Sequence, residues 1–572
     1  MKVDLLVKNA YVFNSYIKKF IKVDVAVLGQ KIFYIGNADS YNFYADEVVD
    51  ADNKYMIPGL IDIHVHIESS MTTPYAFSHE LIKNGVTTVV AEPHEIANVF
   101  GVEGIKAMIE IGKDCNLDIY YGIPSSVPST SQKYETTGAC IDVEDIEVLV
   151  HENNVICLGE VMNYYDVINS PGAKVNKILE YFRKNYPEMP IEGHCPVLKG
   201  LDLAKVVYDG IDSDHTHQTV EGLRERIMNG VFVEIQEKSM SQPVIDFLVQ
   251  NKLYEHFCLV TDDVMADILI EEGHLNKLVK KAIKMGMSPE NAVYVSTFTP
   301  ARRMGLKDRG SIAPGKLADF VLLEDIEDFK IVKVYKKGKK VYDRKEKYAF
   351  TEKRKLFPDR FYRSIRLPNI TADKFQIKAP IKRGSIKCRL IKVNEGSTFT
   401  EEKICEVNVK DGFLDWENSP HCIVAVFERY NNTGNFGIGL ITGDIIKEGA
   451  VAATYAHDHH NLIVVSKTVK DAVKAANTVI ESQGGYCAVQ NGEILSLVEL
   501  PVAGILSEES LNSIGKKLSS LRSAMHRLGY RHYNSVMSLS TISLPVSPLL
   551  KLTDKGLVKL DEKRIVELFV EE

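Results

Sequence analysis

The chain has 572 residues, more than one ordinary domain holds, so we expect about two to four domains. Hydrophobic residues make up 45% and charged residues 26%, values typical of a globular protein. The formal net charge of −8 lacks the basic balance that nonspecific nucleic-acid binding needs, and no apolar run approaches the roughly 20 residues that span a bilayer. We therefore expect neither nucleic acid nor membrane among the partners.

The nine cysteines are scattered, odd in number and form no C-x-x-C motif. This pattern favours a reducing, cytoplasmic compartment. The first residues, Met1–Leu6, show no hydrophobic signal-peptide segment. We expect a cytoplasmic protein.

The first fifty residues alternate as short strands at Asp4–Val12, Val23–Leu28 and Lys31–Ile35, separated by glycines. From Ile57 the pattern changes to strand followed by helix. The predicted strands are Ile61–His66, Thr87–Ala91, Asp118–Pro124, Val155–Glu160, Pro190–His194, Ile211–His215, Val231–Ile235 and Cys258–Asp262. The amphipathic stretches between them include Val143–Asn153, Lys174–Asn185, Thr219–Asn229 and Gln242–Asn251. Eight strands alternating with helices predict an α/β fold, a (β/α)8 TIM-like barrel.

Downstream, Ser288–Gly305 is predicted to be helical, with a late interruption at Thr299-Pro300-Ala301. Gly310–Leu322 indicates a turn and a strand, and Lys333–Tyr342 indicates one more strand. Asp343–Lys374 is charged and irregular, as in a linker. The last part is predicted to hold strands at Ile423–Phe427 and Leu462–Val465 and a helix at Lys470–Ser482.

These elements divide into three predicted domains. Residues 1–56 and 306–345 form a discontinuous small β-sandwich-like domain, residues 57–305 form the barrel, and residues 375–572 form an additional C-terminal α+β domain.

A pair of histidines lies on the first barrel strand. His64 and His66 point to the same side because strand side chains alternate with period two, and paired imidazoles suit a transition metal. Four more candidate ligands each end a short apolar run: Glu160, His194, His215 and Asp262. All lie at the carboxyl ends of predicted strands, the face where barrel enzymes carry out their chemistry.

Six ligands with two carboxylates among the imidazoles suit two divalent metal ions, and the mixed nitrogen and oxygen set is compatible with Mn, Fe or Zn. Such a centre activates a bridging water as a hydroxide near neutral pH. The expected target is an electron-poor carbon, either an amide carbonyl or an amidine that carries an amino group. Asp262 is the predicted ligand and proton shuttle.

Longer motifs carry a resemblance to known proteins. Pro58–His66, with Gly310–Asp319 downstream, resembles the amidohydrolase superfamily. The segments that more narrowly resemble the adenine deaminase family are His66–Met71, Glu92–Val99, Thr261–Val264, Gly273–Asn276, Ala456–Val465, Leu500–Gly504 and Leu552–Leu557. The resemblance implies hydrolysis of adenine to hypoxanthine and ammonia in purine salvage, and a homodimer.

Site roles follow from the resemblance. His64 and His66 would bind one metal, His194 and His215 the second, and Glu160 would bridge them. Manganese is the first choice among the candidate metals. A glutamate at the bridge differs from relatives with a carboxylated lysine there, such as hydantoinases, and this difference favours a deaminase.

Residues around the ligands have two interpretations. Glu92 and His94 are predicted catalytic or ligand-orienting groups, with a capped loop as the alternative. The predicted substrate-binding residues are Glu68, Ser69, Ser70 and Glu95. A helix cap is the alternative role for the two serines and their neighbour Glu68.

The chain departs from the family pattern at Thr216, where a glutamate is usual, and at Gln236, where an arginine is usual. An arginine would be a fixed cation near the barrel mouth, and glutamine does not replace it. Two alternatives therefore stay open: a related amidohydrolase acting on another aminopurine or a cyclic amide, and a non-catalytic purine-binding paralogue.

The cluster His457–His460 resembles a metal site in isolation. We interpret it as a hydrogen-bonded turn before the strand Leu462–Val465, because the barrel already supplies a full ligand set. Contact of this cluster with the barrel mouth, within one subunit or between two, stays open.

Overall fold

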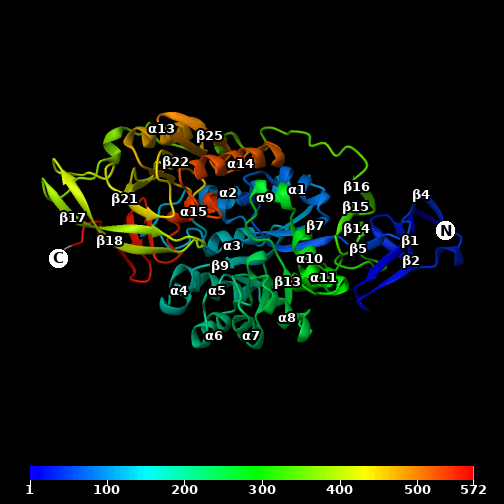
Figure 1. The fold of residues 1–572 in the computed structure, drawn as a ribbon. Coiled ribbons are helices and arrows are strands. Elements are labelled where there is room, and N and C mark those ends of the chain that lie inside the picture. The colour runs from blue at the N-terminus through cyan, green and yellow to red at the C-terminus, as the bar shows by residue number, and fades with distance from the viewer. Residues whose placement is uncertain (571–572) are drawn as a thin grey trace.

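The computed structural model describes residues 1–570. The N-terminal strands lie at one end of an elongated molecule, the barrel occupies the middle, and the C-terminal strands lie at the other end (Figure 1). None of the helices in this part of the chain is long and apolar enough to cross a membrane.

The central domain contains the eight predicted strands. They are β6 (Leu60–Val65), β7 (Val86–Ala91), β8 (Asp118–Ile123), β9 (Val155–Val161), β10 (Ile191–Gly193), β11 (Ser213–Asp214), β12 (Phe232–Ile235) and β13 (Phe257–Leu259). They pair in parallel in the orders β10-β9-β8-β7-β6 and β11-β12-β13. Two backbone bonds join these sheets, from Asp212 N to Ile191 O (3.1 Å) and from Asp262 N to His64 O (3.0 Å). The predicted barrel is confirmed.

Helices follow the strands and pack around the barrel (Figure 1). They are α1 (Pro74–Lys83), α2 (His94–Gly112), α3 (Val143–Leu149), α4 (Tyr164–Asn169), α5 (Lys174–Asn185), α6 (Gly200–Tyr208), α7 (Val220–Met228), α8 (Gln242–Gln250), α9 (Ala266–Glu272) and α10 (Leu275–Lys284). Helix α5 has the predicted bounds, and its Val175, Ile178, Leu179 and Phe182 are buried, as the period of an amphipathic helix requires.

The segment predicted as Ser288–Gly305 is two helices, α11 (Pro289–Val295) and α12 (Phe298–Arg303). The interruption lies at residues 296–297, so its prediction at Thr299-Pro300-Ala301 is wrong. Pro300 belongs to the first turn of α12, where the missing N–H removes no bond within the helix.

The N-terminal sheet joins both ends of the barrel segment. Its strands are β1 (Lys2–Asn14), β2 (Lys19–Leu28), β3 (Lys31–Gly36), β4 (Tyr44–Asp50), β5 (Tyr55–Pro58), β14 (Phe320–Asp325), β15 (Lys330–Lys336) and β16 (Lys339–Asp343). Strand β14 pairs with β5 across about 260 residues of chain. The single strand predicted at Lys333–Tyr342 is wrong: Lys337 (φ 51°) and Gly338 (φ 79°) form a tight reversal between two strands.

The C-terminal region contains a nine-stranded sheet in the order β19-β18-β17-β21-β20-β23-β22-β24-β25. Its strands are β17 (Gly384–Val393), β18 (Thr400–Lys410), β19 (Phe413–Leu414), β20 (Cys422–Phe427), β21 (Phe436–Gly443), β22 (Ala450–Ala453), β23 (Leu462–Ser466), β24 (Gly485–Gln490) and β25 (Glu493–Glu499). A small sheet of β26 (Leu550–Thr553), β27 (Gly556–Lys559) and β28 (Arg564–Val566) and the helices α13 (Val469–Glu481), α14 (Leu511–Arg527) and α15 (Ser535–Ser540) complete it.

This region packs directly on the barrel. The Asp554 carboxylate accepts hydrogen bonds from the backbone and hydroxyl of Thr136 (2.9 and 2.6 Å), and Ser507 N donates to Met71 O (2.9 Å). In Figure 1, α14 lies beside α1 and α9. The C-terminal region therefore covers the barrel face on which the strands end.

Candidate metal centre

The first two predicted ligands come from the end of β6. His64 and His66 are 2% and 3% exposed. The His66 Nδ1 atom lies 3.1 Å from the backbone oxygen of Glu92, so its Nε2 is directed away from that strand. That Nε2 lies 3.4 Å from Glu160 Oε1 and 3.3 Å from Asp262 Oδ1.

Glu160 lies between the two histidine pairs. It comes from the end of β9, and its Oε1 faces His66. Its Oε2 lies 2.9 Å from His194 Nδ1 and 3.3 Å from His215 Nε2. One carboxylate therefore contacts imidazoles from both sides, the arrangement that a bridging ligand requires.

Asp262 follows β13 and lies beside β6, at the seam where the barrel closes. Its carboxylate lies 3.7 Å from His64 Nε2. Its backbone is left-handed, with φ 60°, which costs an aspartate roughly 1–3 kcal/mol and persists because the surrounding structure holds it. Here the bond from Asp262 N to His64 O closes the barrel and fixes that conformation.

Electrostatics keep these carboxylates ionised. Burial raises the pKa of Asp262, but contacts with His64 and His66 outweigh it and place the pKa well below the usual range. The pKa of Glu160 is likewise lowered well below its usual range, because His194 and His215 outweigh burial. Both groups are thus in the form that binds cations.

The donor set fits divalent metal ions. The ligand atoms of buried His64, His215 and Asp262 all lie within 4.8 Å of one another, and so do those of Glu160, His215 and the half-buried His194. Within residues 1–570, the His64 Nε2 and His215 Nδ1 atoms are buried without a hydrogen-bond partner. Imidazole nitrogens and carboxylate oxygens at these separations suit Mn, Fe or Zn.

Glu92 and His94 lie beside the six candidate ligands. The Glu92 carboxylate bonds His94 Nδ1, and it lies 3.8 Å from His66 Nδ1. Burial lowers the pKa of His94, but Glu92 and Glu95 outweigh it and raise the pKa well above the ordinary value. The opposite nitrogen, Nε2, lies 3.6 Å from Glu95 Oε1.

The four predicted substrate-binding residues differ in their surroundings. Burial raises the pKa of Glu68 to about 7, and its Oε1 accepts a bond from Ile96 N (3.4 Å). Ser69 Oγ donates to Asp263 and lies 3.2 Å from Tyr455 Oη. Ser70 Oγ donates to Ile67 O (2.6 Å), so that hydroxyl serves the local turn.

Glu95 contacts the C-terminal region. Its Oε1 lies 2.7 Å from His457 Nε2 and its Oε2 lies 2.5 Å from His460 Nε2. The cluster His457–His460 therefore contacts the barrel mouth within the same chain, in addition to preceding β23. The cluster itself was the only sequence signal for this contact. Its partner Glu95 lies more than 360 residues earlier, so the sequence did not identify that partner.

The two departures from the family pattern lie at the site, and each has a local partner. Gln236 Nε2 donates to His215 O (2.6 Å), and Thr216 Oγ1 donates to Asp214 (3.1 Å). Lys238 Nζ lies 3.8 Å from Asp262 Oδ2, with the side chain 53% exposed. Sequence reasoning missed this lysine, which places a cation at the barrel mouth two residues after Gln236.

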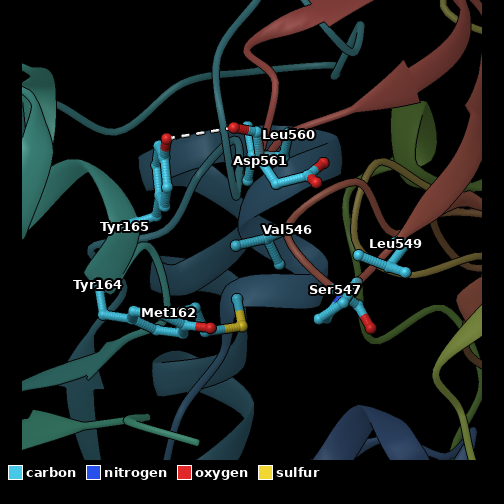
Figure 2. A pocket seen from close by; sticks show the side chains of 9 residues that line it. Met162, Tyr164, Tyr165, Val546, Ser547, Leu549, Leu560 and Asp561 are labelled. Atoms are coloured by element: carbon cyan, nitrogen blue, oxygen red, sulfur yellow. Dashed lines mark hydrogen bonds between the residues drawn. The ribbon is translucent and has the colours of Figure 1, made fainter. Parts of the chain in front are cut away.

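A pocket opens between the barrel and the C-terminal region. Figure 2 shows Met162, Tyr164 and Tyr165 on one side and Val546, Ser547 and Leu549 on the other. Tyr165 Oη donates to Asp561 O (3.3 Å) across it. Met162 lies two residues after Glu160, but none of the six candidate ligands lines this pocket.

Buried imidazoles and carboxylates at the carboxyl face of a closed parallel barrel define a metal-dependent barrel enzyme. The model of the Amidohydrolase family matches residues 55–341, and that of the adenine deaminase C-terminal domain matches residues 397–564. The adenine deaminase of Clostridium perfringens (strain ATCC 13124) is 52% identical over 572 residues, covering 100% of both chains. Adenine deaminase 2 of Shouchella clausii (51%, 100% of both chains) and the adenine deaminase of Lactobacillus delbrueckii subsp. bulgaricus (44%, 99% of both) are also similar. The chain belongs to the adenine deaminase family of amidohydrolases.

Proposed function

We propose that this protein hydrolyses adenine to hypoxanthine and ammonia. The observation that carries the proposal is a series of overlapping groups of metal-capable residues that together include all six candidate ligands, in a chain 52% identical over its full length to a curated adenine deaminase. Neither Gln236 nor Thr216 favours a different reaction, because both bond to neighbouring protein groups.

We propose that the centre holds two divalent ions, with manganese the first candidate before iron and zinc. His64 and His66 would hold one ion, His194 and His215 the other, and Glu160 would bridge them, with Asp262 completing the set. When bound, the ions would lower the pKa of a water so that it is a nucleophile near neutral pH.

The residues of the chain supply the proton transfers and the orientation. Asp262, ionised and held by the barrel seam, accepts the proton of the attacking water and returns it to the departing amino group, which leaves as ammonia. Glu92 and His94 hold the His66 side of the site in place. Glu68 and Ser69 are the groups we propose to contact the purine, because their side chains are buried beside the ligands.

Ammonia release from adenine by the purified protein, reloaded separately with Mn, Fe and Zn, tests the proposal. We expect release with adenine and little with guanine, cytosine or hydantoin. Asp262→Asn should lower kcat/KM by about 10³–10⁴-fold, because the proton relay is lost. Asp246→Asn, a change on the outer helix α8, is the matched control and should leave the rate unchanged.

Turnover of another amine or of a cyclic amide, with none of adenine, would overturn the substrate assignment. A rate near the unmodified value in Asp262→Asn would overturn the proton relay.

We further propose a homodimer in the cytoplasm. All nine cysteines are unpaired, which supports a reducing compartment. The homodimer rests on the usual symmetry of oligomers, and light scattering of the purified protein tests it.

A further inference from the structure

A second group of buried donor atoms lies at the junction of the barrel and the C-terminal region. The His94 nitrogen that faces away from Glu92, Nε2, lies 3.6 Å from Glu95 Oε1 and 3.8 Å from Asp458 Oδ1. His94, Glu95 and Asp458 are 4%, 0% and 1% exposed. Their ligand atoms all lie within 4.8 Å of one another. None of the proposed roles in the catalytic centre uses Asp458.

The Asp458 carboxylate lacks hydrogen bonds. Within residues 1–570, neither of its oxygen atoms has a hydrogen-bond partner, and its distance to His94 is too long for one. A buried carboxylate left in this state is costly, so native structures pair it with donors or with a metal ion. Its Oδ1 faces the His94 imidazole, which the Glu95 carboxylate also approaches.

Two histidines hold Glu95 in place. His457 Nε2 and His460 Nε2 lie 2.7 and 2.5 Å from its two oxygens. These separations are shorter than those between two ligands of one ion, so both histidines contact Glu95 directly. Within residues 1–570, the Asp458 carboxylate has no such partner.

We propose that a divalent transition-metal ion binds between His94, Glu95 and Asp458, separate from the two ions of the catalytic centre. Ligand bonds of about 2.0–2.2 Å place two donors of one ion roughly 3.0–3.6 Å apart, close to the separations seen here. One imidazole with two carboxylates selects Mn, Fe or Zn over Ca or Mg. His457 and His460 would support the ion by orienting Glu95.

The proposed ion connects two regions of the chain. His94 and Glu95 begin α2 on the barrel, whereas Asp458 belongs to the loop between β22 and β23. Binding would fix the loop of residues 454–461 over the barrel mouth, where Tyr455 also contacts Ser69. The role of the ion is thus to position this loop, and the chemistry stays at the catalytic centre.

Metal counting tests the inference without reference to turnover. The full-length protein, reloaded with Mn²⁺ and freed of excess ion by gel filtration, should contain three equivalents by elemental analysis. Asp458→Asn should contain one equivalent fewer, with an unchanged circular dichroism spectrum. Asp554→Asn, another buried aspartate between the same two regions, is the matched control and should keep all three.

Anomalous diffraction at the Mn edge, from crystals of the unmodified protein, gives a second answer that does not depend on any variant folding. We expect a peak between His94, Glu95 and Asp458 in addition to those of the catalytic centre. Peaks at the catalytic centre alone would overturn the inference. So would Asp458→Asn with an unchanged metal count and only a raised KM, since Asp458 would then contact substrate. The metal count and the diffraction peaks are read without adenine turnover, so the two proposals fail separately.

Discussion

Asp262 combines two tasks at the level of a single residue. Its backbone N–H closes the barrel against His64, and its carboxylate faces both histidines of β6. The same residue therefore closes the barrel and positions the carboxylate that we propose as the proton shuttle. The nearby Lys238 adds a positive charge at 3.8 Å.

Replacing Lys238 should change the pH dependence of the reaction. The pKa of Asp262 is low because His64, His66, His215 and Lys238 together outweigh the desolvation that would raise it. A lowered pKa keeps the carboxylate ionised as pH falls, and removal of the lysine raises that pKa. Lys238→Met should thus move the acid limb of the kcat/KM profile to higher pH, by a few tenths of a unit, since the half-exposed lysine is screened by water.

The matched variant is Lys238→Arg, which keeps the charge and should keep the profile. An acid limb that stays in place in Lys238→Met, or moves to lower pH, would contradict this role.

At the level of elements, the packing of α14 decides how the C-terminal region fits the barrel. Arg522 on this helix pairs with Asp267 on α9. Gly515 lies so close to α9 that a β-carbon there would stand 3.0 Å from the Ala266 backbone oxygen. The glycine therefore permits the close approach of the two helices, and a larger side chain would separate them.

Gly515→Val should loosen this contact. Overpacking at such a site costs about 1–3 kcal/mol, so we expect a lower midpoint of thermal unfolding and faster proteolysis of the C-terminal region. Limited proteolysis with mass spectrometry measures the effect. Ser519→Val, an exposed site on the same helix, carries the same β-branched side chain and should show little change. Equal cleavage rates in the two variants would contradict the packing argument.

Elements with strong local signals were predictable from the sequence, and those that depend on turn geometry were less so. Helix α5 and the eight barrel strands follow from hydrophobic period. The Lys337-Gly338 reversal was missed because residues 333–342 are compatible with one continuous strand. The break lies before α12, earlier than the predicted break at Pro300, because a proline fits the first turn of a helix.

At the level of the whole molecule, the candidate site depends on contacts that local patterns do not encode. The metal-capable residues at the strand ends were predictable because the barrel topology collects them on one face. The contacts of Glu95 with His457 and His460 were not predictable, because they join segments more than 360 residues apart. Lys238 was missed because its contact with Asp262 joins the segment after β12 to the segment after the neighbouring strand β13, and local patterns do not encode that contact.

Metal removal should destabilise the entire protein. A ligand that binds only the folded state adds about 3–4 kcal/mol at 100–1,000 times its Kd. Chelation should therefore lower the Tm by several degrees, and Mn²⁺ should restore it, as scanning calorimetry would measure.

The double variant His64→Ala/His66→Ala should lose less Tm on chelation, because part of the binding is already gone. Identical Tm values before and after chelation of the unmodified protein would contradict metal-linked stability.

The loop that contacts Ser69 through Tyr455 is made well after the barrel strands. Strands β6 to β13 leave the ribosome first, and residues 260–453 lie between β13 and the loop of residues 454–461. A growing chain thus exposes its metal-capable face to the solvent until this loop has been made. Only then can the chain bring that face under its own cover.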